Sequence, residues 1–160
     1  LHTAYRRQRQ MCIRDRFNIG TVRILTGGVT EAAWQLMKNT IAEKTAKYES
    51  INIIGSGGNI NKLYRLIEKK DKKRKRITVS ALQTMYNKLQ PLTPEERMEQ
   101  FSLKPDRADV IVPASEIFLT IAETIHAEYI HVPEIGVADG IIDALYAKDQ
   151  LKKQSDNALQ

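Results

Sequence analysis

The stretch Ile51-Asn52-Ile53-Ile54-Gly55-Ser56-Gly57-Gly58-Asn59 decides the fold. It begins with four residues typical of a short buried strand and ends in a glycine turn. Behind the turn, apolar residues recur at the three- and four-residue spacing of a helix face, at Ile60, Leu63, Tyr64 and Ile67. A strand, a turn and a helix in this order are the building unit of α/β folds, so the sequence predicts an α/β domain around this segment.

The glycine turn is the candidate phosphate-binding segment. Glycines let an anion approach the backbone, and the N-terminus of the following helix offers unpaired N–H groups and a partial positive charge. The residues concerned are Gly55, Ser56, Gly57, Gly58 and Asn59, of which the serine and the asparagine can add hydrogen bonds. The spacing is neither that of a P-loop nor that of a dinucleotide-binding GxGxxG turn. A tight turn without a ligand is therefore the alternative.

The rest of the chain continues the alternation of strands and helices. We expect a strand at 17–25, a helix at 30–47, helices that begin with capping boxes at Ser80 with Gln83 and at Thr93 with Glu96, a strand at 129–132, and a last helix at 141–147 preceded by a cap and turn at Asp139 and Gly140. This order predicts an α/β fold with right-handed crossovers.

A further helix within residues 106–126 is expected to be largely buried. Its apolar residues recur at three- and four-residue intervals, at Val110, Ala114, Ile117, Ile121 and Ile125. Pro113 removes a backbone donor and clashes with the preceding turn, so the helix should begin or bend there.

The formal net charge of +6 is concentrated at the start of the chain. Residues 1–16 contain five arginines and one aspartate, and without them the net charge falls to +2. The segment MCIRDR at 11–16 resembles the translation of a transposase adapter used in sequencing libraries. We therefore expect residues 1–16 to be non-native, and the natural chain to have been cut near Phe17.

A second basic segment, EKKDKKRKR at 68–76, is expected to form a solvated connection. The alternative is a binding module for an anion or a nucleic acid that uses the cations of this run, which are Lys69, Lys70, Lys72, Lys73, Arg74, Lys75 and Arg76. A nucleic acid is not expected as a partner, because no aromatic residue interrupts the run for base stacking.

Several classes of protein are not expected from the composition. No apolar run approaches the ~20 residues of a membrane-spanning helix, so we expect a cytoplasmic protein without a membrane partner. The single cysteine, Cys12, cannot form an internal disulfide, and the three histidines lack the spacing of metal ligands. No metal site is therefore expected within this chain.

Four motifs follow one another in a characteristic order: FNIGTVR at 17–23, GSGGN at 55–59, RADVIVPA at 107–114 and ADGII at 138–142. With these motifs the chain resembles the exopolyphosphatase and guanosine pentaphosphate phosphohydrolase family (Ppx/GppA) of the actin-like phosphotransferase superfamily. The resemblance implies an actin-like, ribonuclease H-like ATPase lobe with an incomplete mixed sheet and flanking helices. It also implies that residues 17–148 are part of the C-terminal lobe of the phosphatase core, followed by a polar tail at 149–160.

The resemblance further implies a phosphohydrolase that releases terminal phosphate from inorganic polyphosphate or guanosine pentaphosphate, with Mg²⁺ as cofactor and a homodimeric parent. Arg107 falls on a family arginine thought to contact polyphosphate, and its planar guanidinium suits a pair of phosphate oxygens. A salt bridge to Asp106 or Asp109 is the alternative. Thr21 follows Gly20 at the position of the cleft edge, where its hydroxyl could bind phosphate; a strand residue without a ligand is the alternative.

The chain departs from the family in the parts that carry catalysis. The DxGSNS loop, the catalytic glutamate and the D-[IV]-GGGS-x-E loop belong ahead of FNIGTVR, and this sequence contains none of them. The ligands of the implied Mg²⁺ are absent with them. We therefore assign no catalytic residue and expect this chain to be inactive by itself. Another actin-like enzyme, such as a sugar or carboxylate kinase, is the alternative.

Overall fold

The structure, a computed structural model, describes residues 16–134 and 137–157. Almost all of the segment expected to be non-native lies outside the described residues, as do residues 158–160 of the expected tail. The elements are α2 (Thr21–Leu25), α3 (Glu31–Thr45), β1 (Ile53–Ile54), α4 (Gly58–Leu66), β2 (Arg76–Thr78), α5 (Val79–Leu89), α6 (Pro94–Phe101), α7 (Pro105–Ala108), α8 (Ile111–Thr124), β3 (Tyr129–His131) and α9 (Val137–Asn157). They confirm the expected α/β class.

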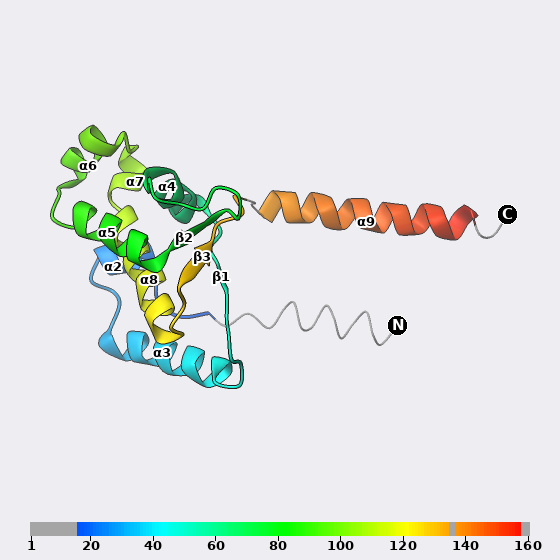
Figure 1. Cartoon of the computed structure of the whole chain (residues 1–160), viewed down its shortest axis with the longest axis horizontal. Coiled ribbons are helices and arrows are strands. Elements are labelled where there is room, and N and C mark those ends of the chain that lie inside the picture. The colour runs from blue at the N-terminus through cyan, green and yellow to red at the C-terminus, as the bar shows by residue number, and fades with distance from the viewer. Residues whose placement is uncertain (1–15, 135–136, 158–160) are drawn as a thin grey trace.

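A mixed sheet joins the three strands in the order β1-β3-β2 (Figure 1). Ile130 of β3 pairs with Ile53 of the parallel strand β1 and with Ile77 of the antiparallel strand β2. The parallel pair confirms the strands expected near 51–54 and 129–132. The sequence did not predict β2, because three residues between a charged run and a helix show no periodicity. Since β2 is antiparallel to β3, it begins beside the end of β3, where Arg76 pairs with His131.

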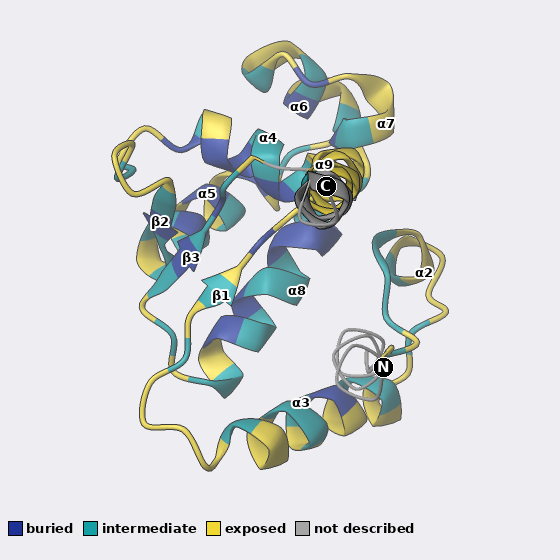
Figure 2. Cartoon of the chain, turned by 90° about the vertical axis from the view of Figure 1, so that its right-hand side faces the viewer, coloured by how far each residue is buried: buried dark blue, intermediate teal, exposed yellow. Residues whose placement is uncertain are grey.

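The main core lies on one face of the sheet. Ile77 and Ile130 are at most 1% exposed, and they share a cluster with Leu63 of α4 and Ile111 of α8. Figure 2 shows α8 running alongside the sheet with alternating buried and intermediate positions. Successive strand residues point to opposite faces, and Ile54 on the other face is 71% exposed. The sheet therefore buries one face and leaves part of the other accessible.

Two helices begin at the caps that the sequence predicts. In α3, the backbone N–H of Ala33 donates to Thr30 Oγ1 over 3.2 Å. In α6, Glu96 N donates to Thr93 Oγ1 over 3.2 Å, and Thr93 N donates to Glu96 Oε2 over 2.8 Å. The second arrangement is the predicted capping box, with Pro94 in the first turn where its missing N–H costs nothing.

The capping box predicted at Ser80 and Gln83 is wrong. α5 is capped instead by Thr78, whose Oγ1 accepts from Ala81 N over 3.1 Å. Thr78 is also the last residue of β2, so the helix begins directly after this unpredicted strand, two residues earlier than expected. Ser80 consequently lies within the first turn of α5.

The strand predicted at 17–25 is also wrong. Its second half forms the short helix α2, in which Ile24 N donates to Gly20 O over 2.9 Å. In the part of the chain that the structure describes, none of the three strands pairs with this segment. Local hydrogen bonds therefore satisfy its backbone, and the β-branched residues did not decide the conformation. Thr21 becomes the first residue of a helix.

The buried helix predicted within 106–126 is divided into α7 and α8. Pro113 is the third residue of α8, a position whose backbone N–H has no partner within a helix. The predicted stripe is right only in part, because Ala114 is buried whereas Ile117 and Ile121 are partly exposed. α8 contacts α2, α3, α4 and α5, so its packing is not confined to one stripe. Its buried residues are Ile111, Pro113, Ala114, Ser115, Leu119 and Ala122.

The cap and turn predicted at Asp139 and Gly140 are wrong as well. Both residues lie inside α9, which is longer than the helix predicted at 141–147. A single glycine costs a helix only about 1 kcal/mol, so Gly140 need not end it. α9 extends away from the rest of the described chain (Figure 1), and its apolar residues Ile142 and Leu145 are 63% and 61% exposed.

Candidate functional site

A hollow of about 260 Å³ lies where β1 ends and α4 begins. Its lining comes from α2, the glycine turn, α4, α7 and α8, and consists of Thr21, Ser56, Gly57, Gly58, Asn59, Ile60, Arg107, Ala114, Ile117 and Phe118. Six of the seven residues that the sequence predicts for phosphate binding thus share one hollow. The exception is Gly55.

Gly55 is buried under the turn. A Cβ atom at this position would lie 2.8 Å from Ile60 Cγ1 and 3.3 Å from both Ile130 Cγ2 and Phe118 Cε1. Its backbone N–H donates to His131 O over 2.8 Å, which extends the pairing of β1 with β3. The glycine is therefore required by close packing. Gly55 itself does not line the hollow.

The turn reverses at Gly57 and leads directly into α4. Gly57 has φ +107° and ψ 168°, a backbone region that residues with a side chain rarely adopt. As the N-cap it has no side chain to bond the helix, so the first N–H groups of α4 have no capping partner. These N–H groups border the hollow together with the positive end of the helix dipole.

Arg107 reaches the glycine turn from α7. Its Nη1 donates to Asn59 Oδ1 over 2.8 Å, and its Nη2 lies 2.8 Å from the place where a Cβ of Gly58 would stand. Its Nε also lies 3.6 Å from Asp106 Oδ2, an exposed ion pair. The salt bridge considered as an alternative therefore exists, but it leaves the two terminal nitrogens of the guanidinium against the turn. A weak exposed pair does not fix such a side chain strongly.

Replacing Gly58 by alanine is expected to displace the Arg107 guanidinium, because the new methyl group would occupy its place. The free energy of unfolding should change by at most about 1 kcal/mol, since alanine favours a helix and the obstacle is a flexible side chain. Affinity for inorganic triphosphate, measured by calorimetry, should fall. Gly140→Ala is the matched control, because a Cβ there meets nothing within 4 Å. Equal affinities of the two variants would show that the Arg107 guanidinium at Gly58 does not contribute to phosphate binding.

The hollow does not suit a magnesium ion. Its polar groups are hydroxyls, amides and a guanidinium, whereas Mg²⁺ favours carboxylate oxygens. The carboxylate of Asp106 does not line the hollow and pairs with Arg107. Among residues 16–134 and 137–157, no three carboxylate, histidine or cysteine side chains are grouped as a metal site.

The apolar wall of the hollow was not predicted. Ile60, Ala114 and Ile117 were assigned to buried helix faces, and Phe118 was given no role. Ile60 and Ala114 lie near the starts of α4 and α8, whereas Ile117 and Phe118 lie in the middle of α8, and no sequence pattern assigns these four residues to one wall. Such a wall excludes water from one side of a bound group and strengthens its hydrogen bonds.

None of the helices that the structure describes is long and apolar enough to cross a membrane.

The model of the Ppx/GppA phosphatase family matches residues 18–149. The chain is similar in structure to the Aquifex aeolicus member of the Ppx/GppA family, with a TM-score of 0.64 and 22% identity over 81% of this chain and 47% of that one. It is also similar to an exopolyphosphatase from Cytophaga hutchinsonii, with a TM-score of 0.62 and 17% identity over 81% of this chain and 48% of that one. A comparison with curated proteins finds no match.

These similarities confirm the predicted fold class, an actin-like lobe with a small mixed sheet and flanking helices. At these identities they concern the fold alone. The chain spans about half the length of the structures it matches.

Proposed function

We propose, since this chain belongs to the Ppx/GppA phosphatase family, that the complete protein releases terminal phosphate from inorganic polyphosphate or guanosine pentaphosphate. The observation that carries the proposal is the contact of Arg107 with the glycine turn, in a hollow bordered by the N-terminus of α4. The family match also favours a phosphatase over the actin-like kinase considered as an alternative. The cytoplasmic location and the homodimeric parent remain predictions.

The site binds a phosphate group through three kinds of donor. The N–H groups in the first turn of α4 approach it without hindrance, because Gly57 and Gly58 have no side chains. The hydroxyls of Ser56 and Thr21 add hydrogen bonds from the rim. The Arg107 guanidinium supplies charge in a planar arrangement that matches two phosphate oxygens. Phosphoryl transfer depends mainly on positioning and on electrostatic stabilisation, and these donors serve both.

Hydrolysis requires groups that do not line this hollow. The hollow contains no carboxylate to act as a general base or to hold the magnesium ion that the family implies. We therefore assign binding and orientation of the phosphate to this chain, and no catalytic step. The chain by itself should bind a phosphate chain without cleaving it.

Replacing Arg107 by alanine is expected to weaken the binding of inorganic triphosphate by about 10- to 100-fold, the equivalent of one charge-assisted hydrogen-bonded contact. Arg107→Lys should recover only part of the loss, because an ammonium group lacks the planar fork. Titration calorimetry measures both, and Arg65→Ala, which removes an exposed arginine paired with Glu134, is the control. Unchanged affinity of the Arg107→Ala variant would refute the phosphate site. Release of phosphate from polyphosphate by this chain with magnesium would refute its inactivity.

A further inference from the structure

The short helix α7 carries Arg107 but does not hold itself in place. It has only four residues, whereas a helix of fewer than ~12–15 residues is marginal in water by itself. Its N-cap, Lys104, makes no side-chain cap bond, although Lys104 O accepts from Arg107 N over 2.9 Å and from Ala108 N over 3.0 Å. The position of α7 is therefore decided by its contacts with α6 and α8.

Arg97 of α6 makes a polar contact between α7 and its surroundings. Its Nη1 donates to Ala108 O over 2.9 Å, its Nε to Leu89 O over 2.9 Å, and its Nη2 to Gln90 O over 3.5 Å. The last carbonyl groups of a helix lack partners within that helix, and a cation is favoured at this end of the helix dipole. One planar guanidinium thus caps the ends of α5 and α7 together.

The Arg97 guanidinium is a buried charge without a paired carboxylate. The residue is only 9% exposed, and the ion pairs within residues 16–134 and 137–157 do not include it. Burial lowers the pKa of Arg97, and the charge of Asp109 partly opposes this effect. A buried charge destabilises a fold unless its hydrogen bonds are satisfied, and an apolar side chain would serve packing alone as well. The arrangement therefore favours a role of Arg97 in geometry.

The position of α7 decides where the Arg107 guanidinium lies. Ala108, whose carbonyl oxygen accepts from Arg97, directly follows Arg107 in the chain. At the far end of the Arg107 side chain, Nη1 lies 2.8 Å from Asn59 Oδ1, and Nη2 lies 2.8 Å from the place of a Gly58 Cβ. The fit is close at both atoms. A small displacement of α7 would therefore move the guanidinium away from the glycine turn.

We infer that Arg97 is a positioning residue for phosphate binding, which holds α7 so that the Arg107 guanidinium already lies against the glycine turn when the ligand arrives. The inference rests on the proposed function and adds to it a residue that does not line the hollow. A guanidinium held in its binding position loses little conformational freedom on binding, so the phosphate is bound more tightly. Arg97 thus sets the affinity of the hollow without touching the ligand.

The first test replaces Arg97 by lysine, which keeps the positive charge but loses the planar set of donors. Affinity for inorganic triphosphate, measured by calorimetry on the 160-residue chain, should fall by about 3- to 10-fold. Arg97→Met should lower it at least as much, but by no more than Arg107→Ala, because Arg97 acts through Arg107. Trimethylamine N-oxide in every sample favours the compact state of the weakened variants, and circular dichroism verifies that they are folded.

A first control separates this effect from a general loss of stability. Met37→Ala truncates a side chain that is 2% exposed in α3. Within the described chain, α3 lies at the opposite end from α6 and α7 (Figure 1). This variant should be destabilised by the cavity and still bind triphosphate as tightly as the wild type.

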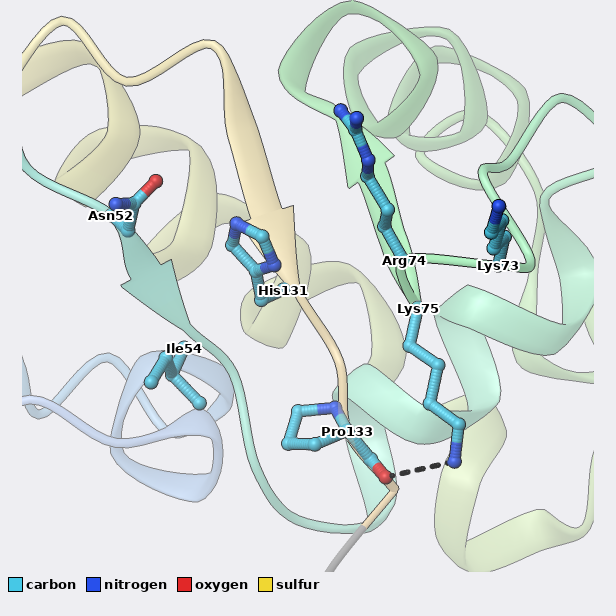
Figure 3. A pocket seen from close by; sticks show the side chains of 7 residues that line it. All are labelled: Asn52, Ile54, Lys73, Arg74, Lys75, His131 and Pro133. Carbon is cyan, nitrogen blue, oxygen red and sulfur yellow. Dashed lines mark hydrogen bonds between the residues drawn. The ribbon is translucent and has the colours of Figure 1, made fainter.

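A second control lies in another hollow, of about 480 Å³, on the accessible face of the sheet. Its cations come from the expected solvated connection, which is an exposed turn closed by two backbone hydrogen bonds between Asp71 and Arg76. Asn52→Ala changes this hollow and leaves α7 untouched, so its affinity for triphosphate should match that of the wild type. The lining residues drawn in Figure 3 include none from α6 or α7; they are Asn52, Ile54, Lys73, Arg74, Lys75, His131 and Pro133.

A double-substitution cycle tests whether Arg97 acts through Arg107. In a chain that already carries Arg107→Ala, Arg97→Lys should change the triphosphate affinity by less than about twofold. The free energy of unfolding should fall by nearly the same amount with and without Arg107→Ala, because the carbonyl bonds of Arg97 do not involve the Arg107 side chain. A residue with only a structural role would not show this difference between the two measurements.

Several results would overturn the inference. Unchanged triphosphate affinity of both Arg97 variants, beside a weakened Arg107→Ala, would show that α7 needs no such anchor. A loss in Arg97→Met that Arg97→Lys does not share would assign the effect to charge and not to geometry. A loss of the same size with and without Arg107→Ala would exclude an action through Arg107, and an equal loss in Met37→Ala would indicate stability alone. The proposed function fails separately if Arg107→Ala binds triphosphate as tightly as the wild type.

Discussion

Replacing Arg97 by methionine is expected to lower the free energy of unfolding by about 3–4 kcal/mol. The residue is only 9% exposed, and its guanidinium donates to Leu89 O and Ala108 O over 2.9 Å each and to Gln90 O over 3.5 Å. Methionine fills similar space but donates nothing, so the carbonyl groups of Ala108 and Gln90 would lose the Arg97 donor in a buried place, and Leu89 O would keep only its bond from Leu92 N. Arg97 thus links the end of α5 to Ala108 of α7, the residue that follows Arg107.

Denaturant unfolding of the two proteins measures this effect. Arg65→Met is the matched control, because Arg65 makes its ion pair at the surface, where such pairs contribute about 0–1 kcal/mol. Arg97→Lys should fall between the wild type and Arg97→Met, since one ammonium group cannot reach carbonyls in three directions equally well. A loss below 1 kcal/mol for Arg97→Met, or one equal to that of the control, would show that these buried bonds contribute little.

Replacing Ile130 by alanine is expected to cost about 2–5 kcal/mol of unfolding free energy. Ile130 is fully buried in the middle strand of the sheet, between Ile53 and Ile77, and its Cγ2 lies directly below Gly55. The truncation removes apolar contacts and leaves a cavity under the glycine turn. Denaturant unfolding measures this loss as a shift of the denaturation midpoint.

The matched control is Ile54→Ala in the neighbouring strand β1. It removes the same side-chain atoms from a β-strand, but Ile54 is 71% exposed, so the free energy of unfolding should fall by less than about 1 kcal/mol. If both variants are destabilised equally, the accessible face of the sheet must be covered in solution, contrary to the structure described here.

The residues of the candidate site were largely predictable, whereas their surroundings were not. Glycines and an arginine are recognisable without a fold, since few residue types suit close approach to an anion. The sequence did not show that Gly55 serves packing, because that depends on the side chains of Ile130 and Phe118 far along the chain. It likewise could not reveal that Thr21 lies on a helix, since β-branched residues favour a strand only where another strand pairs with them.

Arg97 and β2 show why the remaining features escaped prediction. Arg97 lies in a polar helix, and no pattern distinguishes a buried arginine from the exposed residues around it; its role depends on carbonyls of α5 and α7. β2 is too short to show alternation and exists because β3 offers it an edge. By contrast, the caps at Thr30 and Thr93 are interactions within three residues, and both were predicted correctly.

Backbone hydrogen bonds on both sides of β3 join the glycine turn to the segment that leads into β2. His131 O accepts from Gly55 N on one side, and Val132 N donates to Lys75 O on the other. The separation of Gly55 and Lys75 is therefore set by the spacing of hydrogen-bonded strands, which hardly varies, and not by the flexibility of a loop.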